Sequence, residues 1–174
     1  MMMMKKAKKE ESNNEDEVYY NIIKNFLFLS LQDKTSLKTV ALRLSGVLSA
    51  SLEGIQMLKS AHATKRIANI ATSDDRENAK LALMVIASHS AMRPTSKAAI
   101  SIIPYLFDML DKKEYEPYPL ISIANLCVNP AAAKDCVPHL SKLVDLLDSN
   151  SIPTLNRTFT ALYRIFKSPE ACEM

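Results

Sequence analysis

The amino-acid sequence predicts an all-α protein in which a helical unit of about forty residues recurs. The first observation is that the 174 residues include only two glycines, against an ordinary usage of about 7%. Glycine supplies the tight turns of β-rich folds and the loops that cradle phosphate groups, so its scarcity favours helices. The second observation is that apolar residues recur at helical spacing, as in Leu37, Val40, Ala41, Leu44, Val47 and Leu48. That spacing places one apolar stripe on a helix.

Helical periodicity continues along most of the chain. Asp74 and Asp75 stand at one predicted helix start, where carboxylates cap free amide groups and oppose the helix dipole. Prolines mark several breaks, because proline lacks an amide hydrogen and is tolerated mainly in the first helical turn. No Asn-Gly or Asp-Gly hairpin signal occurs in the sequence. Helices are expected at 17–31, 34–50, 52–60, 63–71, 74–90, 97–111, 118–128, 135–148 and 153–167.

A short core recurs in four of these helices at intervals of 39, 40 and 39 residues. The copies read LSGV, LMVI, IANL and LYRI, and they start at Leu44, Leu83, Ile123 and Leu162. The first and fourth positions hold a large aliphatic residue in every copy. The last three cores are each preceded by a further helical segment, which starts at Thr64, Ile103 and Val137. A period near forty made of two or three helices is typical of helical-repeat proteins.

These segments resemble the armadillo family, whose repeat carries an IPxLVxLL helix followed by an ALxNL helix. Residues 103–110 (IPYLFDML) are similar to the first, and residues 121–126 (ISIANL) to the second, including Asn125. The resemblance covers roughly residues 20–168 and implies a right-handed α-α superhelix, an armadillo-type solenoid of about three to four repeats. Residues 52–60 match the short first helix of the repeat. The equivalent helix after Leu126 is expected to be reduced or absent, which makes a HEAT-like pair plausible near the C-terminus.

The repeat domain is expected at 16–168, between two tails. Residues 1–15 contain no aromatic or β-branched side chain and carry blocks of like charge. They cannot bury enough apolar surface to offset the entropy of ordering. We therefore expect a disordered, charged N-terminal tail at 1–15 and a short C-terminal tail at 169–174. Four lysines within residues 5–9 fit a weak nuclear import signal, although a solvated tail is the preferred interpretation.

In armadillo proteins the stacked third helices form a concave groove for extended peptides, and a ladder of asparagines holds the peptide backbone. The resemblance implies ladder positions at Gly46, Val85, Asn125 and Arg164. Only one of the four is asparagine. Importin-like members also carry a tryptophan four residues earlier, where this chain has Leu42, Leu81, Ile121 and Thr160. A receptor of the importin type is therefore not expected.

Asn125, Arg164 and Arg157 are the candidate partner-binding residues of this groove. An amide side chain both donates and accepts hydrogen bonds, and arginine holds carboxylates in bidentate pairs. The resemblance thus implies a scaffold or adaptor that binds a protein or peptide partner, polar or acidic in character. Two alternatives stay open. Asn125 bridges the backbone between repeats, or the partner binds the convex face or an end of the solenoid.

Two further functions compete with the adaptor. A structural subunit of a larger cytoskeletal or trafficking assembly predicts large apolar patches at the ends or the convex face. An RNA-binding repeat protein needs basic and stacking side chains once per unit, and the four cores do not supply them. An enzyme is not expected because no catalytic motif is found, and neither a cofactor nor a metal site is predicted.

The isolated histidines and cysteines are interpreted structurally. His62 and His89 lie among small or polar residues and are expected at the surface. His139 is expected to have a structural role, and Cys127 to be buried as a small apolar residue.

Composition places the protein in the cytoplasm or the nucleus. Three cysteines without CxxC spacing suit a reducing compartment. No run reaches the roughly 18 apolar residues of a membrane helix. The net charge of +3 is too small to predict nucleic-acid binding, which needs a clustered basic face.

Overall fold

The computed structural model describes residues 2–32 and 36–172, with side chains described from Asp16 onward. All regular structure in these residues is helical, as the sequence predicts. Short 3₁₀ turns lie at η1 (Lys113–Tyr115), η2 (Val137–His139) and η3 (Leu146–Asp148). The α-helices are α1 (Met2–Ser30), α2 (Lys38–Leu48), α3 (Leu52–Ser60), α4 (Ala63–Ala71), α5 (Arg76–Met92), α6 (Lys97–Ile100), α7 (Ile103–Asp108), α8 (Tyr118–Leu126), α9 (Pro130–Cys136), α10 (Leu140–Asp145), α11 (Ile152–Lys167) and α12 (Pro169–Cys172).

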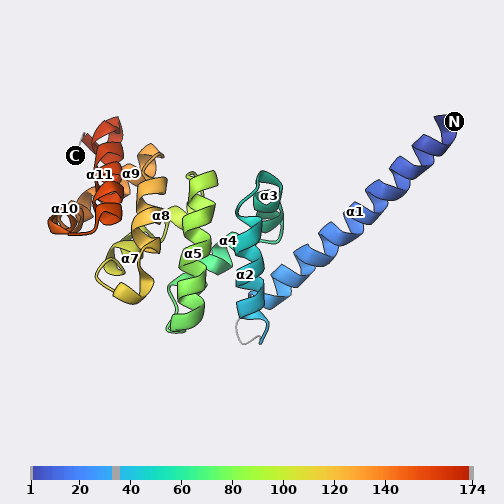
Figure 1. Ribbon diagram of the computed structural model, residues 1–174, viewed down its shortest axis with the longest axis horizontal. Coiled ribbons are helices and arrows are strands. Elements are labelled where there is room, and N and C mark those ends of the chain that lie inside the picture. Colours follow the sequence, from blue (N-terminus) through green and yellow to red (C-terminus); the bar gives the residue numbers. More distant parts are fainter. Residues whose placement is uncertain (1, 33–35, 173–174) are drawn as a thin grey trace.

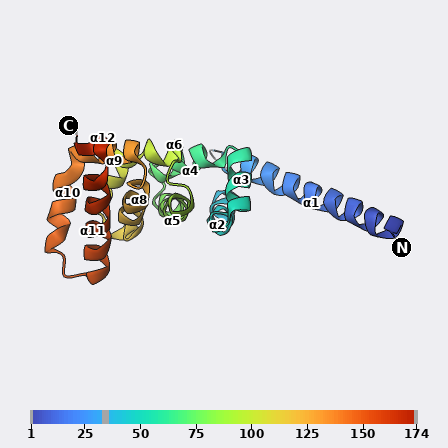
Figure 2. The same ribbon diagram turned by 90° about the horizontal axis from the view of Figure 1, so that it is seen from above.

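Each structural repeat consists of two shorter helices followed by a longer one. Three complete repeats lie within the described residues, α3–α4–α5, α6–α7–α8 and α9–α10–α11, with α1–α2 before them and α12 after them. The last helices of successive units, α2, α5, α8 and α11, stand side by side, and each contacts the next (Figure 1). We call these four helices the long-helix row. The shorter helices form a second layer behind it (Figure 2). The predicted α-solenoid is confirmed, and its right-handedness stays a prediction.

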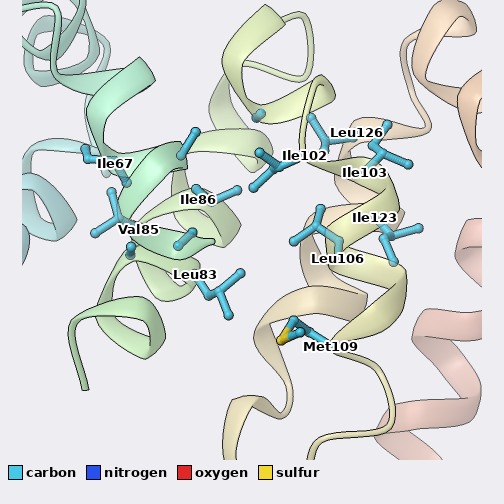
Figure 3. Packing of buried hydrophobic residues seen from close by; sticks show 14 of the residues in the cluster. Ile67, Leu83, Val85, Ile86, Ile102, Ile103, Leu106, Met109, Ile123 and Leu126 are labelled. Atoms are coloured by element: carbon cyan, nitrogen blue, oxygen red, sulfur yellow. The ribbon is translucent and has the colours of Figure 1, made fainter. Parts of the chain in front are cut away.

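One hydrophobic core runs through all the repeats, because each repeat can bury its apolar face only against its neighbours. The core extends from Leu27 in α1 to Ile165 in α11, and it includes the predicted core residues Leu83, Ile123 and Leu162. Side chains of α4 and α5 lie beside those of α7 and α8 in its middle part (Figure 3). Burial of each such aliphatic side chain contributes about 1.5–3 kcal/mol. The repeats therefore stabilise one another across their interfaces.

The predicted alignment of the first long helix is wrong by two residues. Val47, predicted to lie in the core, is 73% exposed, while its predicted equivalents in the other three long helices are buried. Burial instead aligns Leu42 with Leu83. Ser45 then takes an aliphatic core position, which it can fill because its hydroxyl donates to the carbonyl oxygen of Ala41 at 2.8 Å. A pattern of aliphatic residues alone could not reveal this register.

The corrected register moves two predicted positions on α2. The ladder position is Leu44 rather than Gly46, and the position equivalent to the family's tryptophan is Val40 rather than Leu42. Leu42 is fully buried, whereas Val40 is exposed. Helix α2 therefore presents an aliphatic side chain, Leu44, at the ladder position where the sequence alignment placed a glycine.

The short helix expected to be reduced or absent after Leu126 is present as α9 (Pro130–Cys136). The side chain of Asn129 caps it by accepting a hydrogen bond from the backbone N–H of Ala131 at 3.1 Å. Pro130 opens the first turn, where its missing amide hydrogen costs nothing. The shorter spacing of this repeat arises after α9, because α9 ends at Cys136 and η2 begins at the next residue, without a connecting loop. The expectation of a HEAT-like pair is therefore wrong, and this repeat has three helices like the others.

Helix α1 joins the solenoid through its C-terminal part. Leu27 and Leu31 are buried in the core, and the Tyr20 hydroxyl lies 2.8 Å from Ser60 Oγ. The N-terminal part extends away from the repeats (Figures 1 and 2). Residues 2–15 belong to this extension, and their side chains are not described. The disordered tail predicted at 1–15 stays a prediction. Of the predicted tail at 169–174, residues 169–172 form α12, which contacts α9 and α11, and 173–174 lie outside the described residues.

The predicted start of the fifth helix is confirmed at Asp75. Its carboxylate accepts hydrogen bonds from the backbone N–H and the side-chain Nδ2 of Asn78, at 3.2 and 2.7 Å. These bonds lower the pKa of Asp75 because they favour its charged form. Thr39 Oγ1 donates to Asn78 Oδ1 at 2.9 Å, so the same turn also ties α5 to α2.

Candidate functional site

One side of the long-helix row is not covered by the second layer. On α8 the incompletely buried residues are Tyr118, Ile121 and Asn125, followed by Val128 just beyond the helix end. They lie three or four residues apart and so share one side of the helix. We call this side of the row the open face, and we define it by the equivalent positions of the four helices. They are Val40, Leu44 and Val47; Leu81 and Ser88; Ile121, Asn125 and Val128; and Thr160, Arg164 and Lys167. On α5 the ladder position Val85 is buried.

Asn125 lies in the middle of the open face and links two repeats. Its Nδ2 donates to the carbonyl oxygen of Ala87 at 3.2 Å and to Ser90 Oγ at 3.5 Å, both on α5. Asn125 therefore bridges to the backbone of the preceding repeat, as one of the open alternatives expected. Its Oδ1 has no hydrogen-bond partner among the described residues. Every fully buried side-chain oxygen in these residues does have a partner. Oδ1 is therefore not fully buried and can accept a hydrogen bond from a ligand.

Arg164 repeats this arrangement one unit further along. Its Nη1 donates to the carbonyl oxygen of Ala124, so α11 is tied to α8 as α8 is tied to α5. Arginine has five N–H donors, and this bond uses one of them. Arg157 lies two turns earlier on α11 and lines a separate small cleft with Glu116 and Leu120. The structure therefore brings Asn125 and Arg164 onto one face and places Arg157 beside a different cleft.

The long-helix row carries an excess of positive charge. Its four helices contain seven Lys or Arg residues and a single acidic residue, Glu77. Helix α8 carries no charged residue, and the charged residues of α11 are all cations. Arg164 and Lys167 of α11 occupy the positions equivalent to Asn125 of α8 and to Val128 just beyond its end. The open face is therefore a surface with an apolar middle and a basic C-terminal side.

The C-terminal end of the solenoid exposes aromatic side chains that sequence reasoning did not single out. Phe159, Tyr163 and Phe166 of α11 are all exposed. Tyr163 and Phe166 occupy the positions of Ala124 and Ala87, whose carbonyls accept hydrogen bonds from the following long helix. These aromatic residues therefore face the position that a further repeat would occupy. An apolar patch at an end, which the assembly hypothesis predicts, is present.

The prediction that His89 lies at the surface is wrong. His89 is buried beneath Thr64 of α4 and Ala99 of α6, because the second layer covers this side of α5. Burial and the nearby charge of Arg93 lower the pKa of His89. His62 is exposed as expected, and its backbone adopts a left-handed conformation with φ of 52°.

His139 and Cys127 have the structural environments predicted for them. The His139 ring stacks on Phe107, with ring centroids 4.8 Å apart. Cys127 is buried, and its Sγ lies 3.5 Å from Sγ of the buried Cys136. The hydrogen bond to Cys127, burial, and electrostatic interactions with Cys127 and Asp135 raise the pKa of Cys136.

No group of three or more His, Cys, Asp or Glu in the described part of the chain is arranged to hold a metal ion. No described helix combines the length and apolarity needed to cross a bilayer.

Solved structures similar to this chain include designed armadillo repeat proteins. One designed armadillo repeat protein is 25% identical, covers 79% of this chain and 62% of its own, and has a TM-score of 0.66. A second, in complex with the peptide (KR)4, is 20% identical over 83% of this chain and 69% of its own, with a TM-score of 0.65. An engineered protein gives a TM-score of 0.71 at 22% identity over 84% of this chain, which spans 38% of that protein.

No protein-family model and no curated protein matches the chain. The structural likeness shows that the chain has an armadillo-like helical-repeat fold, as the sequence motifs implied.

Proposed function

We propose that this protein is a helical-repeat scaffold that binds an extended segment of a partner protein across the open face, over α5, α8 and α11. The observation that carries the proposal is Asn125, whose Nδ2 is fixed by Ala87 and Ser90 while Oδ1 has no partner among the described residues. An anchored amide is a preorganised acceptor for a backbone N–H of a bound segment, and preorganisation lowers the entropic cost of binding. We propose that the protein acts by binding its partner and does not catalyse a reaction.

The partner segment combines apolar residues with acidic ones. Exposed Val128 and half-buried Ile121 offer apolar contact, and Arg164 and Lys167 supply positive charge without a carboxylate on α8 or α11. One similar designed protein is described in complex with (KR)4, and computationally designed armadillo proteins are described as made for modular peptide recognition. Because the charge of the row here is basic, a cationic peptide such as (KR)4 is the wrong partner for this chain.

The proposal can be tested by selecting peptides from a random display library against the intact chain and measuring their affinities. Val128→Asp places a negative charge in the apolar middle of the open face. Val144→Asp is the matched control, because Val144 is equally exposed (52% against 56% for Val128) but lies on α10. Asn125→Ala removes the acceptor, and one hydrogen bond contributes about 0.5–1.5 kcal/mol, roughly a two- to tenfold change in Kd.

The expected result is a set of acidic, partly apolar peptides that lose at least about tenfold in affinity on Val128→Asp and little on Val144→Asp. Asn125→Ala is expected to weaken them less, with helicity checked by circular dichroism because that side chain also joins α8 to α5. Peptides that bind both valine variants equally well would place the site elsewhere. Selection of basic peptides would contradict the charge argument.

A second function, subunit of a larger assembly, is favoured by the exposed Phe159, Tyr163 and Phe166 of α11. In this case an assembly partner contacts the end of the solenoid, separately from a peptide bound to the open face. Phe159→Ser with Phe166→Ser would then abolish assembly and leave peptide binding to the open face unchanged. Analytical ultracentrifugation of the intact chain over a concentration series is the first measurement, since concentration-dependent association lost in this variant would identify a second copy as one partner.

A further inference from the structure

A basic cleft of about 520 Å³ lies on the second layer, away from the open face. It is formed by the turn between α3 and α4, the C-terminal end of α5 and the start of α6. No carboxylate lines it. Its charged and titratable lining residues include Lys59, Lys65, Arg93 and Lys97, with His62 and His89. The proposed function uses none of these residues, because none of them belongs to the open face.

The positive charges of the basic cleft are not neutralised within the protein. Among the described residues, no ion pair joins a lysine or arginine of the cleft to a carboxylate. The ion pair found in the described part of the chain joins Lys142 on α10 to Asp108 on α7. Arg66 also borders the cleft, but its Nη1 donates to the Phe28 carbonyl and its guanidinium lies 4.1 Å from the Phe28 ring centroid. Like charges gathered without counter-charges repel one another, so this arrangement favours a bound anion.

The helix ends do not explain the whole cluster. Lys59 in the last turn of α3 and Arg93 at the end of α5 are stabilised by the negative ends of their helix dipoles. Lys65 lies in the first turn of α4, where the dipole disfavours a cation. Lys97 opens α6. The helix dipole therefore does not account for the presence of Lys65 in this cluster.

Hydrogen-bond donors accompany the charges. The hydroxyl groups of Thr64 and Ser96 line the cleft. His62 precedes α4 without a side-chain cap, so the first backbone N–H groups of this nine-residue helix have no capping partner from it. Free N–H groups at a helix start favour phosphate oxygens. Charge and donors thus converge from four helices on one space.

We propose that the basic cleft binds a small ligand that carries two or more phosphate groups. The cleft volume falls in the range of small-molecule sites, about 300–1,000 Å³, and is too large for one phosphate. A single phosphate could not contact cations contributed by four helices, whereas clustered phosphates could pair with several of them. The ligand would bridge the α3–α4–α5 repeat to α6 of the next, so its binding stabilises the fold. The same chemistry is offered by a soluble polyphosphate and by a phosphoinositide headgroup.

The test uses the intact chain and inositol hexakisphosphate as the probe, measured by isothermal titration calorimetry and by the shift in melting temperature. The cleft variant is Lys65→Glu with Lys97→Glu. The control variant, Lys112→Glu with Lys134→Glu, makes the same change in net charge at exposed lysines outside the cleft. Inorganic phosphate is titrated in parallel. Vesicles of phosphatidylcholine with and without phosphatidylinositol bisphosphate distinguish the lipid source from the soluble one.

The expected result is one-to-one binding with a rise in melting temperature. Affinity should fall by tenfold or more in the cleft variant and change less than about twofold in the control. Inorganic phosphate should bind far more weakly than the probe. Equal losses in the two variants, or no binding by the parent chain, would overturn the proposal. If a doubly phosphorylated peptide displaced the probe and bound more tightly, the ligand of the cleft would be a phosphorylated protein, and the proposal of a small-molecule ligand would be wrong. Val128→Asp, which alters the open face, should leave binding of the probe to the basic cleft unchanged. The experiment therefore tests the basic cleft independently of the proposed peptide site.

Discussion

The two glycines of this chain should respond to alanine substitution with opposite signs. Gly54 lies in the first turn of α3, where the chain turns back over the end of α2. A Cβ atom at Gly54 would lie 2.1 Å from the carbonyl oxygen of Leu48 and 2.7 Å from its carbonyl carbon and Cα. A Cβ atom at Gly46, in the interior of α2, would lie 3.6 Å from Met84 Cε and 3.8 Å from Val85 Cγ2.

These distances set the magnitudes. Ordinary contacts begin near 3.4 Å, so Gly54→Ala requires the backbone of α2 or α3 to move by about 1.3 Å (3.4 − 2.1). Forced overpacking costs roughly 1–3 kcal/mol and sometimes more, and the helix propensity of alanine returns at most about 1 kcal/mol. The movement would also disturb the bond from Gly54 N–H to Ser51 Oγ, now 3.0 Å. Because a backbone movement of this size places the cost at the upper end of that range, about 3 kcal/mol, we expect a net loss of about 2–3 kcal/mol for Gly54→Ala. Gly46→Ala should gain about 0.5–1 kcal/mol, because its contacts need no movement.

Urea unfolding followed by circular dichroism measures both variants, with thermal melts as a second reading. For a chain of this size, 1 kcal/mol corresponds to a shift of roughly 2–4 °C in melting temperature. Gly54→Ala should therefore melt about 4–12 °C below the parent, and Gly46→Ala slightly above it. A Gly54→Ala protein as stable as the parent would show that α3 does not pass this close to the end of α2. The packing of the first repeat described above would then be wrong.

Three other predictions follow from single contacts. Asn129→Ala should destabilise the protein by about 1 kcal/mol through loss of the α9 cap, measured by urea unfolding; an unchanged midpoint would argue against a separate α9. Cys172 is exposed while Cys127 and Cys136 are buried, and the pKa of Cys136 is raised, so a thiol reagent at pH 8 should modify one cysteine in the folded chain and three in urea. Because the pKa of His89 is lowered below its usual 6.5, the unfolded chain binds more protons as the pH falls below 6.5, and the free energy of unfolding should decrease there. His89→Gln should remove this pH dependence and His62→Gln should not; an identical pH profile in His89→Gln would refute the assignment.

The candidate site was only partly accessible to sequence analysis. Asn125 was found because residues 121–126 resemble the ALxNL helix, and Arg164 because the LYRI core aligns with the IANL core. The register of α2 was not, because Ser45 lies in the core where the pattern requires an aliphatic residue. The basic cleft was missed entirely. Its cations come from separate helices, and no local spacing in the sequence relates Lys59 or Lys65 to Arg93 and Lys97.

The sequence by itself determined that the chain is helical, that its unit is about forty residues long and that its units share one apolar core. These properties depend on residues three, four and about forty positions apart, and such spacings can be counted along a chain. The tertiary structure decided which side of α2 is buried, that Asn125 ties α8 to α5 through Ala87, and that His89 lies beneath α4 and α6. It also decided which aromatic residues the solenoid leaves uncovered. The physical reason is that burial and charge clustering depend on which helices stack against each other, and stacking joins residues whose separation carries no fixed period.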